Sequence, residues 1–150
     1  MFNMLVKRGI AFVLDAIILL LIFFGNFTIV MSSMAINPEN PASMSSLLIM
    51  LALQLFYVGL YFIYIPLKWP GQTIGKKILK IKEVTKTGKD LTAKQYFQRD
   101  FLCKFLLASM TSGFIVVFNA ILLTYQCIRK QELCAFHDFL VKTTVISIED

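Results

Sequence analysis

Two long runs of hydrophobic residues dominate the first half of the chain. Residues 10–31 contain Asp15 as their only charged residue, and residues 47–66 contain no charged residue at all. At 1.5 Å per residue these runs would form helices of roughly 33 and 30 Å, close to the thickness of a membrane's hydrocarbon core. We therefore predict two full transmembrane helices, joined by a turn-rich loop over residues 32–46.

A third hydrophobic region, residues 101–128, is interrupted by polar residues. Lys104 lies near its start, and a Thr-Ser-Gly sequence ending at Gly113 lies in its middle. The region fits a single tilted span, or a re-entrant hairpin in which an interfacial helix turns near Gly113 into a deeper one. Its first part belongs to a helical pattern over residues 91–110 that begins polar and becomes apolar. Within it Asp100 and Lys104 are four residues apart and can pair on one face.

The basic segment between the second and third regions carries shorter patterns. Ile74, Ile78 and Ile81 recur at helical spacing with lysines on the other faces, which predicts a short basic helix lying on the membrane surface. Residues 80–84 fit an extended segment, and residues 86–89 fit a hairpin turn. We expect this juxtamembrane segment to stay outside the hydrocarbon core.

Composition agrees with an all-α membrane protein. Hydrophobic residues make up 57% of the 150 residues, too many for an ordinary soluble domain. No linker divides the chain, so we expect a single membrane domain over residues 1–150. The three cysteines are an odd number and predict no disulfide framework.

The placement of charge predicts how the chain lies in the membrane. Lys7 and Arg8 precede the first hydrophobic run, and residues 68–99 hold nine basic residues against two acidic ones. The loop over residues 32–46 has no Lys or Arg. By the positive-inside rule, the N-terminus and the basic segment are cytoplasmic and the first loop lies outside.

Basic residues also follow the third region. Arg129, Lys130 and Lys142 favour a cytoplasmic C-terminus, which requires an even number of crossings and a third region that enters and returns. A single crossing would instead leave the C-terminal tail outside. We expect a multi-pass protein of the cell membrane whose net charge of +6 contacts anionic inner-leaflet lipids, so no nucleic acid partner is needed.

The N-terminus has a rival interpretation as a cleaved signal peptide. Lys7 and Arg8 would be its basic region, and Ser33-Met34-Ala35 its cleavage site. However, the hydrophobic run is longer than the core of a usual signal peptide, and Asp15 interrupts it. We therefore favour an uncleaved transmembrane helix.

No motif predicts catalysis or a cofactor. Residues 71–77 have three residues between their glycines and end in Lys77, whereas a phosphate-binding loop needs four residues there and a final Ser or Thr. His137 is the only histidine, and Cys134 alone does not complete a metal site with it. We therefore expect no cofactor, no metal and no enzymatic activity.

Asp15 is the residue that most needs an explanation. A carboxylate inside a membrane span is disfavoured unless it is paired, hydrated or protonated. Arg8 precedes it by seven residues, so the two share a helix face about 10 Å apart along the axis. Arg8 could reach toward Asp15, or it could bridge to a second acid such as Asp138, which otherwise caps a helix. Asp15 is then either structural glue between helices or a site for an ion or a proton.

These residues together resemble the RDD family, small multi-helix membrane domains named for an arginine and two aspartates. Arg8 matches the arginine that begins the first helix, and Asp15 matches the aspartate inside it. Asp138, preceded by His137, matches the second aspartate near the C-terminus, and Arg99 matches the basic residue that opens the third helix. The resemblance covers nearly the whole chain, in the right order.

The family's juxtamembrane G-x-T-x-G-K motif is also present. It consists of Gly71, Thr73, Gly75 and Lys76. The resemblance implies little about activity, because family members are mostly uncharacterised and transport of ions or unidentified ligands is proposed for some of them.

Two hypotheses from different classes follow. The first is a small transporter for cation–proton exchange or an unidentified ligand, in which Asp15 titrates and Arg8 tunes its protonation. Because two or three spans do not easily enclose a pathway, it would act as a homo-oligomer or with a membrane-protein partner. The second is a non-transporting scaffold or assembly partner in which Arg8, Asp15 and Asp138 lock the helices together.

Overall fold

The first half of the protein is a hairpin of two long helices. The computed structural model describes residues 2–36 and 44–148, and α1 (Phe2–Ile36) is 35 residues long. The second arm begins with α2 (Met44–Gly59) and continues through the π-helical segment η1 (Leu60–Tyr64) into α3 (Ile65–Lys68). Both arms are long and apolar enough to cross a membrane, which confirms the two predicted transmembrane helices.

Both helices are longer than the sequence pattern predicts. At 1.5 Å per residue α1 measures roughly 52 Å, well beyond the hydrocarbon thickness. Because α1 continues to Ile36 and α2 begins at Met44, both ends of the predicted loop over residues 32–46 are helical. The rest of that predicted loop, residues 37–43, lies outside the described residues.

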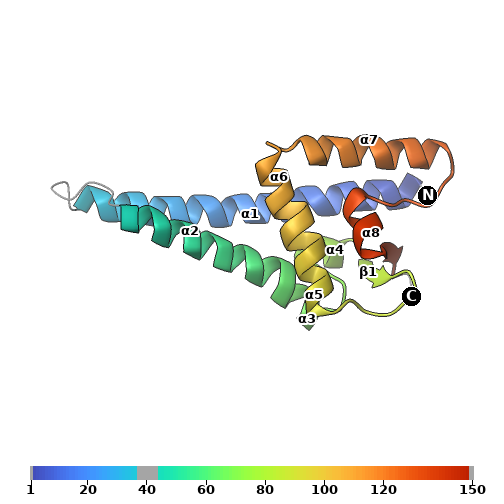
Figure 1. The fold of residues 1–150 in the computed structure, drawn as a ribbon, viewed down its shortest axis with the longest axis horizontal. Coiled ribbons are helices and arrows are strands. Elements are labelled where there is room, and N and C mark those ends of the chain that lie inside the picture. Colours follow the sequence, from blue (N-terminus) through green and yellow to red (C-terminus); the bar gives the residue numbers. More distant parts are fainter. Residues whose placement is uncertain (1, 37–43, 149–150) are drawn as a thin grey trace.

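The third hydrophobic region is a bent pair of helices. Its first arm runs through α5 (Ala93–Tyr96), the π-helical segment η2 (Phe97–Leu106) and α6 (Leu107–Met110), and its second arm is α7 (Phe114–Ile128). The chain bends by 116° between the two arms, at the Thr-Ser-Gly sequence that interrupts the pattern. Figure 1 shows α7 lying beside the N-terminal half of α1, on the side of the molecule where both termini lie. The region is therefore not one continuous helix.

The remaining elements form a small layer at the terminal end of the fold. They are α4 (Ile74–Ile78), β1 (Ile81–Thr85), α8 (Phe136–Val141) and β2 (Thr143–Ser147). β1 and β2 pair in an antiparallel sheet with Glu83 opposite Val145. The prediction of an extended segment is thus confirmed, and a turn follows it, in which the Gly88 amide donates to the Thr85 carbonyl at 2.8 Å. The turn does not lead into a paired strand, because the partner of β1 is the C-terminal strand (Figure 1).

The predicted basic helix is present but short. α4 has only five residues, and it packs against α1. Lys76 is buried, contrary to the prediction, whereas Lys77 and Lys80 are exposed as predicted and Ile78 is 62% exposed. Ile81 leaves the helix altogether and begins β1.

Two small clusters of hydrophobic side chains hold these layers together. Ala11, Ile81 and Val145 join α1 to the sheet. A second cluster is centred on η1 and is formed by Val58, Tyr61 and Phe62. Phe101 and Phe105 of η2 pack against it, so the bent pair is fixed to the helical hairpin.

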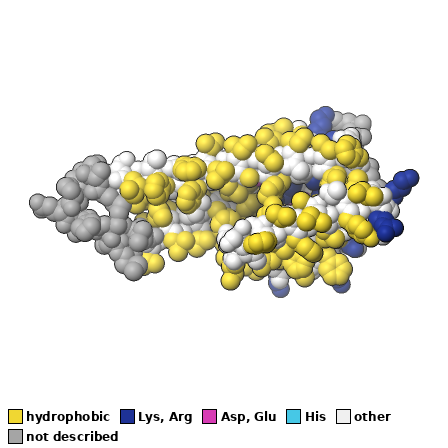
Figure 2. Space-filling view, turned by 90° about the horizontal axis from the view of Figure 1, so that it is seen from above, with side chains coloured by type: hydrophobic (Ala, Val, Ile, Leu, Met, Phe, Trp, Pro, Cys, Tyr) yellow, Lys and Arg dark blue, Asp and Glu magenta, His cyan; other side chains and the backbone are white. Residues whose placement is uncertain are grey.

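Most other large hydrophobic side chains face outward. On the long helices they include Leu21, Ile29, Phe56, Phe114 and Ile121, all more than half exposed. Figure 2 shows hydrophobic side chains over much of one face, with Lys and Arg gathered toward the end that carries the termini. This distribution is expected of helices that contact lipid, with the basic end near headgroups.

Candidate functional site

Asp15 is buried inside the fold and is held by neutral donors. It is 2% exposed. Its Oδ1 accepts hydrogen bonds from the Tyr61 hydroxyl at 2.5 Å and from the Gly75 amide at 2.9 Å, and its Oδ2 accepts one from the Thr73 hydroxyl at 2.6 Å. Three donors from η1 and α4 therefore stabilise the carboxylate within the span.

Gly75 is required by the close approach of α4 to α1. A Cβ at this position would lie 2.4 Å from the carbonyl oxygen of Ala11 and 2.7 Å from Oδ1 of Asp15. Both distances are shorter than a carbon atom tolerates. Only glycine lets the α4 backbone come near enough for its amide to bind Asp15.

Gly71 has a similar role one turn earlier. Its φ is +76°, and a Cβ there would lie 2.3 Å from the carbonyl oxygen of Glu83. Its amide donates to the Tyr96 hydroxyl at 2.8 Å, and its carbonyl accepts from the Glu83 amide at 2.8 Å. The Gly-x-Thr-x-Gly motif therefore docks the juxtamembrane segment onto α1, β1 and α5.

Asp138 is fully buried and collects five donors. Arg8 bonds to its Oδ2, and the Ala135 amide donates to the same oxygen at 3.2 Å. Arg99 donates to Oδ1 through Nε at 3.1 Å and Nη2 at 2.6 Å, and Thr143 donates to Oδ1 at 3.3 Å. Asp138 thus joins α1, η2 and β2 to the start of α8, and it reaches back to cap that helix.

The neighbouring charges set the protonation of Asp138 and His137. Burial raises the pKa of Asp138, but the positive charges of Arg99 and Arg8 outweigh it and hold that pKa well below its usual range. Burial lowers the pKa of His137 to about 3, although Asp138 lies 3.7 Å from its Nε2 and opposes the shift. At neutral pH Asp138 is therefore ionised and His137 is neutral.

The ion pairs extend beyond Asp138. Glu83 is paired with both Lys76 and Arg99, and all three side chains are buried. Asp100 is also fully buried, with Arg99 Nη1 at 3.5 Å and Lys104 Nζ at 3.9 Å. The predicted pair of Asp100 and Lys104 is thus present at ion-pair distance, within a larger network.

The structure separates residues that the sequence placed together. Arg8 bridges to Asp138, which was one of the two alternatives, and its side chain pairs with that acid instead of reaching toward Asp15. Asp15 has its own set of donors. The ion network brings together four of the predicted site residues, Arg8, Lys76, Arg99 and Asp138, and His137 lies beside it. Three others, Gly71, Thr73 and Gly75, hold the juxtamembrane segment in place.

Sequence reasoning missed Glu83 and Tyr61 as site residues. Glu83 alternates with Ile81 along β1, so a strand pattern puts both on the buried face, and that signal was available. Tyr61 had no comparable signal, because its place opposite Asp15 depends on how α1 and η1 pack.

Two cavities adjoin this network. The first has a volume of about 280 Å³, and four cations, Arg8, Lys76, Arg99 and Lys104, contribute to its walls together with Glu83. The second, of about 560 Å³, is mainly apolar and includes Asp15 and Gln54 in its lining. Phe12, Lys104 and Val116 line both cavities.

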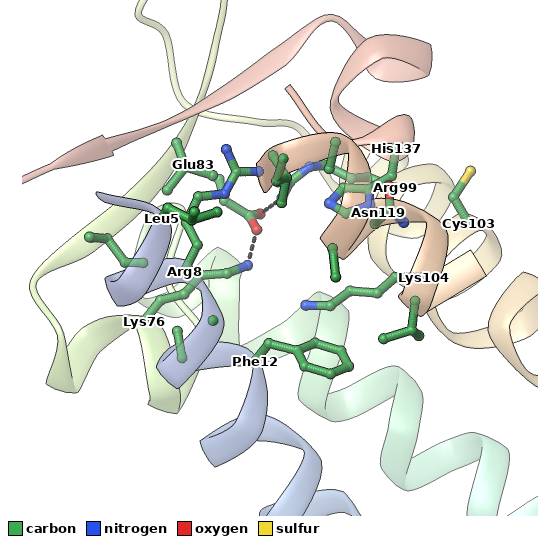
Figure 3. Close-up of a pocket in the computed structure, with 18 of the residues that line it drawn as sticks. Leu5, Arg8, Phe12, Lys76, Glu83, Arg99, Cys103, Lys104, Asn119 and His137 are labelled. Carbon is green, nitrogen blue, oxygen red and sulfur yellow. Dashed lines mark hydrogen bonds and ion pairs between the residues drawn. The ribbon is translucent and has the colours of Figure 1, made fainter. Parts of the chain in front are cut away.

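Figure 3 shows how the first cavity is arranged. Lys104 extends into it above the ring of Phe12, and Lys76 and Arg99 meet at Glu83. Within residues 2–36 and 44–148, no group of three or more His, Cys, Asp or Glu side chains could hold a metal ion. The chemistry of the cavity is therefore basic and apolar.

Comparison with known proteins supports the resemblance. The model of the RDD family matches residues 3–142, nearly the whole chain. A search of curated proteins and a search of solved structures each found no match. The long apolar helices, the docked glycine motif and the arginine–aspartate pairing agree with the family match, and this membrane protein belongs to the RDD family.

Proposed function

We propose that this RDD-family protein is a small membrane transporter that acts as an oligomer. The observation that carries the proposal is the pair of adjoining cavities that share Phe12, Lys104 and Val116. One cavity lies in the ion network, and the other reaches Asp15 and Gln54 inside the helical hairpin. A solute that moved from one cavity to the other would pass these shared side chains.

Oligomerisation supplies the walls that one copy lacks. Two full spans and a bent pair do not enclose a pathway across a membrane. The exposed hydrophobic faces of α1, α2 and α7 offer surfaces for a second copy or for another membrane protein. We propose a homo-oligomer as the working form.

The proposed location is the cell membrane, with both termini and the basic segment in the cytoplasm. Exposed lysines support this placement, and they are Lys77, Lys80, Lys86, Lys89 and Lys94. Trp69 adds a headgroup anchor, with the Lys77 ammonium 3.5 Å from its ring centre. Anionic inner-leaflet lipids are the proposed partners of these lysines, and we propose no nucleic acid partner.

We propose no enzymatic activity. Glu83 and Asp138 are paired with basic side chains, and the lone His137 is half-buried and neutral.

A cavity-filling substitution tests transport. Purified protein in liposomes should be assayed for flux of Na⁺, K⁺ and protons and for movement of a fluorescent short-chain anionic lipid. Val116→Trp fills both cavities and should reduce the flux at least about tenfold, whereas Val117→Trp, on the 57% exposed neighbour, should leave it unchanged. Equal flux in the two variants would contradict a route through the cavities.

Asp15→Asn tests cation–proton exchange separately. An amide can still accept from Tyr61 and Gly75, so the variant should fold, but it cannot release a proton. Loss of proton-coupled cation flux would assign the proton to Asp15. Undiminished pH-dependent flux would exclude it.

A non-transporting scaffold is the second candidate. It is favoured by the complete engagement of both aspartates, since Asp15 has three donors and Asp138 has five. Such sets of hydrogen bonds fix the helices relative to one another. Absence of any flux in the wild-type protein, with a stable oligomer or partner complex retained, would support this candidate.

A further inference from the structure

We propose that the two cavities bind an amphiphilic anion, with its phosphate or carboxylate group on Lys104 and its hydrocarbon chain along Phe12 and Val116. This inference deepens the proposed function by naming the substrate class, and it rests on the same cavities. It requires binding alone, which is measured independently of transport.

Lys104 has donor capacity that the fold does not use. Within residues 2–36 and 44–148 its ammonium forms no hydrogen bond, since its nearest carboxylate oxygen, on Asp100, is 3.9 Å away. The ammonium lies 5.3 Å from the ring centre of Phe62 and 5.8 Å from that of Phe12. In Figure 3 the Lys104 side chain points into the cavity, and its ion pair with Asp100, at 3.9 Å, leaves its hydrogen-bond donors available.

The charges around the first cavity leave room for one more anion. Four cations, Arg8, Lys76, Arg99 and Lys104, contribute to its lining, and Glu83 is the only acid among the lining residues. Asp138 and Asp100, behind the wall, bring the acids of the network to three, which leaves one positive charge in excess. Because buried charges are normally paired, a single anionic group bound to Lys104 would balance the four cations of the network with four negative charges.

The rest of the lining fits a hydrocarbon chain. Beyond Lys104 the second cavity is walled by apolar side chains such as Leu19, Phe23 and Phe105. Asp15 also faces this cavity, but its two oxygens already accept three hydrogen bonds. The lining therefore favours a ligand with one acidic end and an apolar body over a metal cation or a free inorganic anion.

Binding to the purified protein in a neutral maltoside detergent tests the proposal. Decyl phosphate is the probe, with inorganic phosphate and decanol as comparisons, and the affinity is read from the rise of the melting temperature with probe concentration. Decyl phosphate should stabilise the wild-type protein. Lys104→Gln should weaken the affinity about tenfold or more, because it removes the charged donor.

Matched variants keep the test decisive if Lys104→Gln folds poorly. Lys94→Gln removes an exposed lysine from the preceding turns and should bind like the wild type, and Lys104→Arg should retain binding. Val116→Trp should weaken binding with every charge in place. Equal affinity in Lys104→Gln and Lys94→Gln would overturn the proposal, as would equal stabilisation by inorganic phosphate or by decanol.

The source of the anion is distinguished in a second arm. Protein in nanodiscs of phosphatidylcholine, with and without phosphatidylglycerol, should be examined by native mass spectrometry after release. Retention of phosphatidylglycerol by the wild type and its loss in Lys104→Gln would identify a bilayer lipid, whereas decyl phosphate binding alone would identify a soluble amphiphile. Binding without flux in liposomes would retain this inference and contradict only the transport proposal.

Discussion

The hydroxyl of Thr73 donates a 2.6 Å hydrogen bond to Asp15, 58 residues earlier in the chain. This bond ties the juxtamembrane motif to the middle of the first membrane helix. Thr73→Val keeps the shape of the side chain but removes the donor, so it should lower the free energy of unfolding by about 1–3 kcal/mol. Unfolding in detergent measures the change, with the exposed Thr87→Val as control. Equal effects of the two substitutions would show that the bond does not stabilise the fold.

Gly75 should not tolerate a side chain. Gly75→Ala forces a Cβ against the Ala11 carbonyl and Asp15, and we expect a loss of about 1–3 kcal/mol from overpacking. Gly9→Ala, on α1, meets no atom within 4 Å and should be neutral or slightly stabilising in its helix. The two variants are compared by their melting temperatures in detergent. An unchanged melting temperature in Gly75→Ala would contradict the close approach of α4 to α1.

Arg8 should matter far more than its neighbour. Arg8→Ala leaves buried Asp138 without one of its two arginine partners, and breaking such a pair costs about 3–5 kcal/mol. Lys7 donates to the Ser147 hydroxyl at 3.2 Å in a part-buried place, so Lys7→Ala should cost less. Melting temperatures that fall equally in the two variants would reject the role given to Arg8.

Acidification should weaken the fold through His137. Its folded pKa of about 3 lies below the ordinary 6.5, so the unfolded chain binds a proton that the folded chain excludes. Stability is therefore full above pH 6.5 and falls as the pH drops toward 3, by about 2 kcal/mol between pH 7 and pH 5. Unfolding measured at both pH values should show a difference between wild type and His137→Gln of this size and sign. An identical pH dependence of the two proteins would mean that His137 takes up a proton as readily in the folded as in the unfolded chain.

Topology is tested by labelling from outside the cell. In a cysteine-free background a membrane-impermeant reagent should modify Ser45→Cys and spare Lys86→Cys and Glu149→Cys. The reason is the concentration of Lys and Arg in residues 68–99, which the positive-inside rule predicts to be cytoplasmic. External modification of Glu149→Cys would show an odd number of crossings and contradict a third region that enters and returns.

The sequence determined the class of this protein and the main divisions of its fold. Two long apolar runs, with Asp15 as their only charged residue, require helices in a membrane, since every backbone donor there must be satisfied within its own segment. The Thr-Ser-Gly sequence before Phe114 marks the place where the third region bends. These features are local, because helical hydrogen bonds and hydrophobicity depend on neighbours in the chain.

Only the tertiary structure decided which charges meet. From the sequence, Arg8 could pair with either Asp15 or Asp138. The packing of α8 against η2 and α1 brings Asp138 to Arg8. Asp15 accepts hydrogen bonds from neutral donors because Gly75 lets α4 approach α1 closely. The distance between these two helices cannot be read from the periodicity of the sequence. In the same way β1 pairs with the C-terminal strand, and Lys76 turns inward to Glu83. Several acidic and basic side chains are chemically equivalent in the sequence, and only long-range packing determines which of them pair. The same packing forms the cavities beside Lys104.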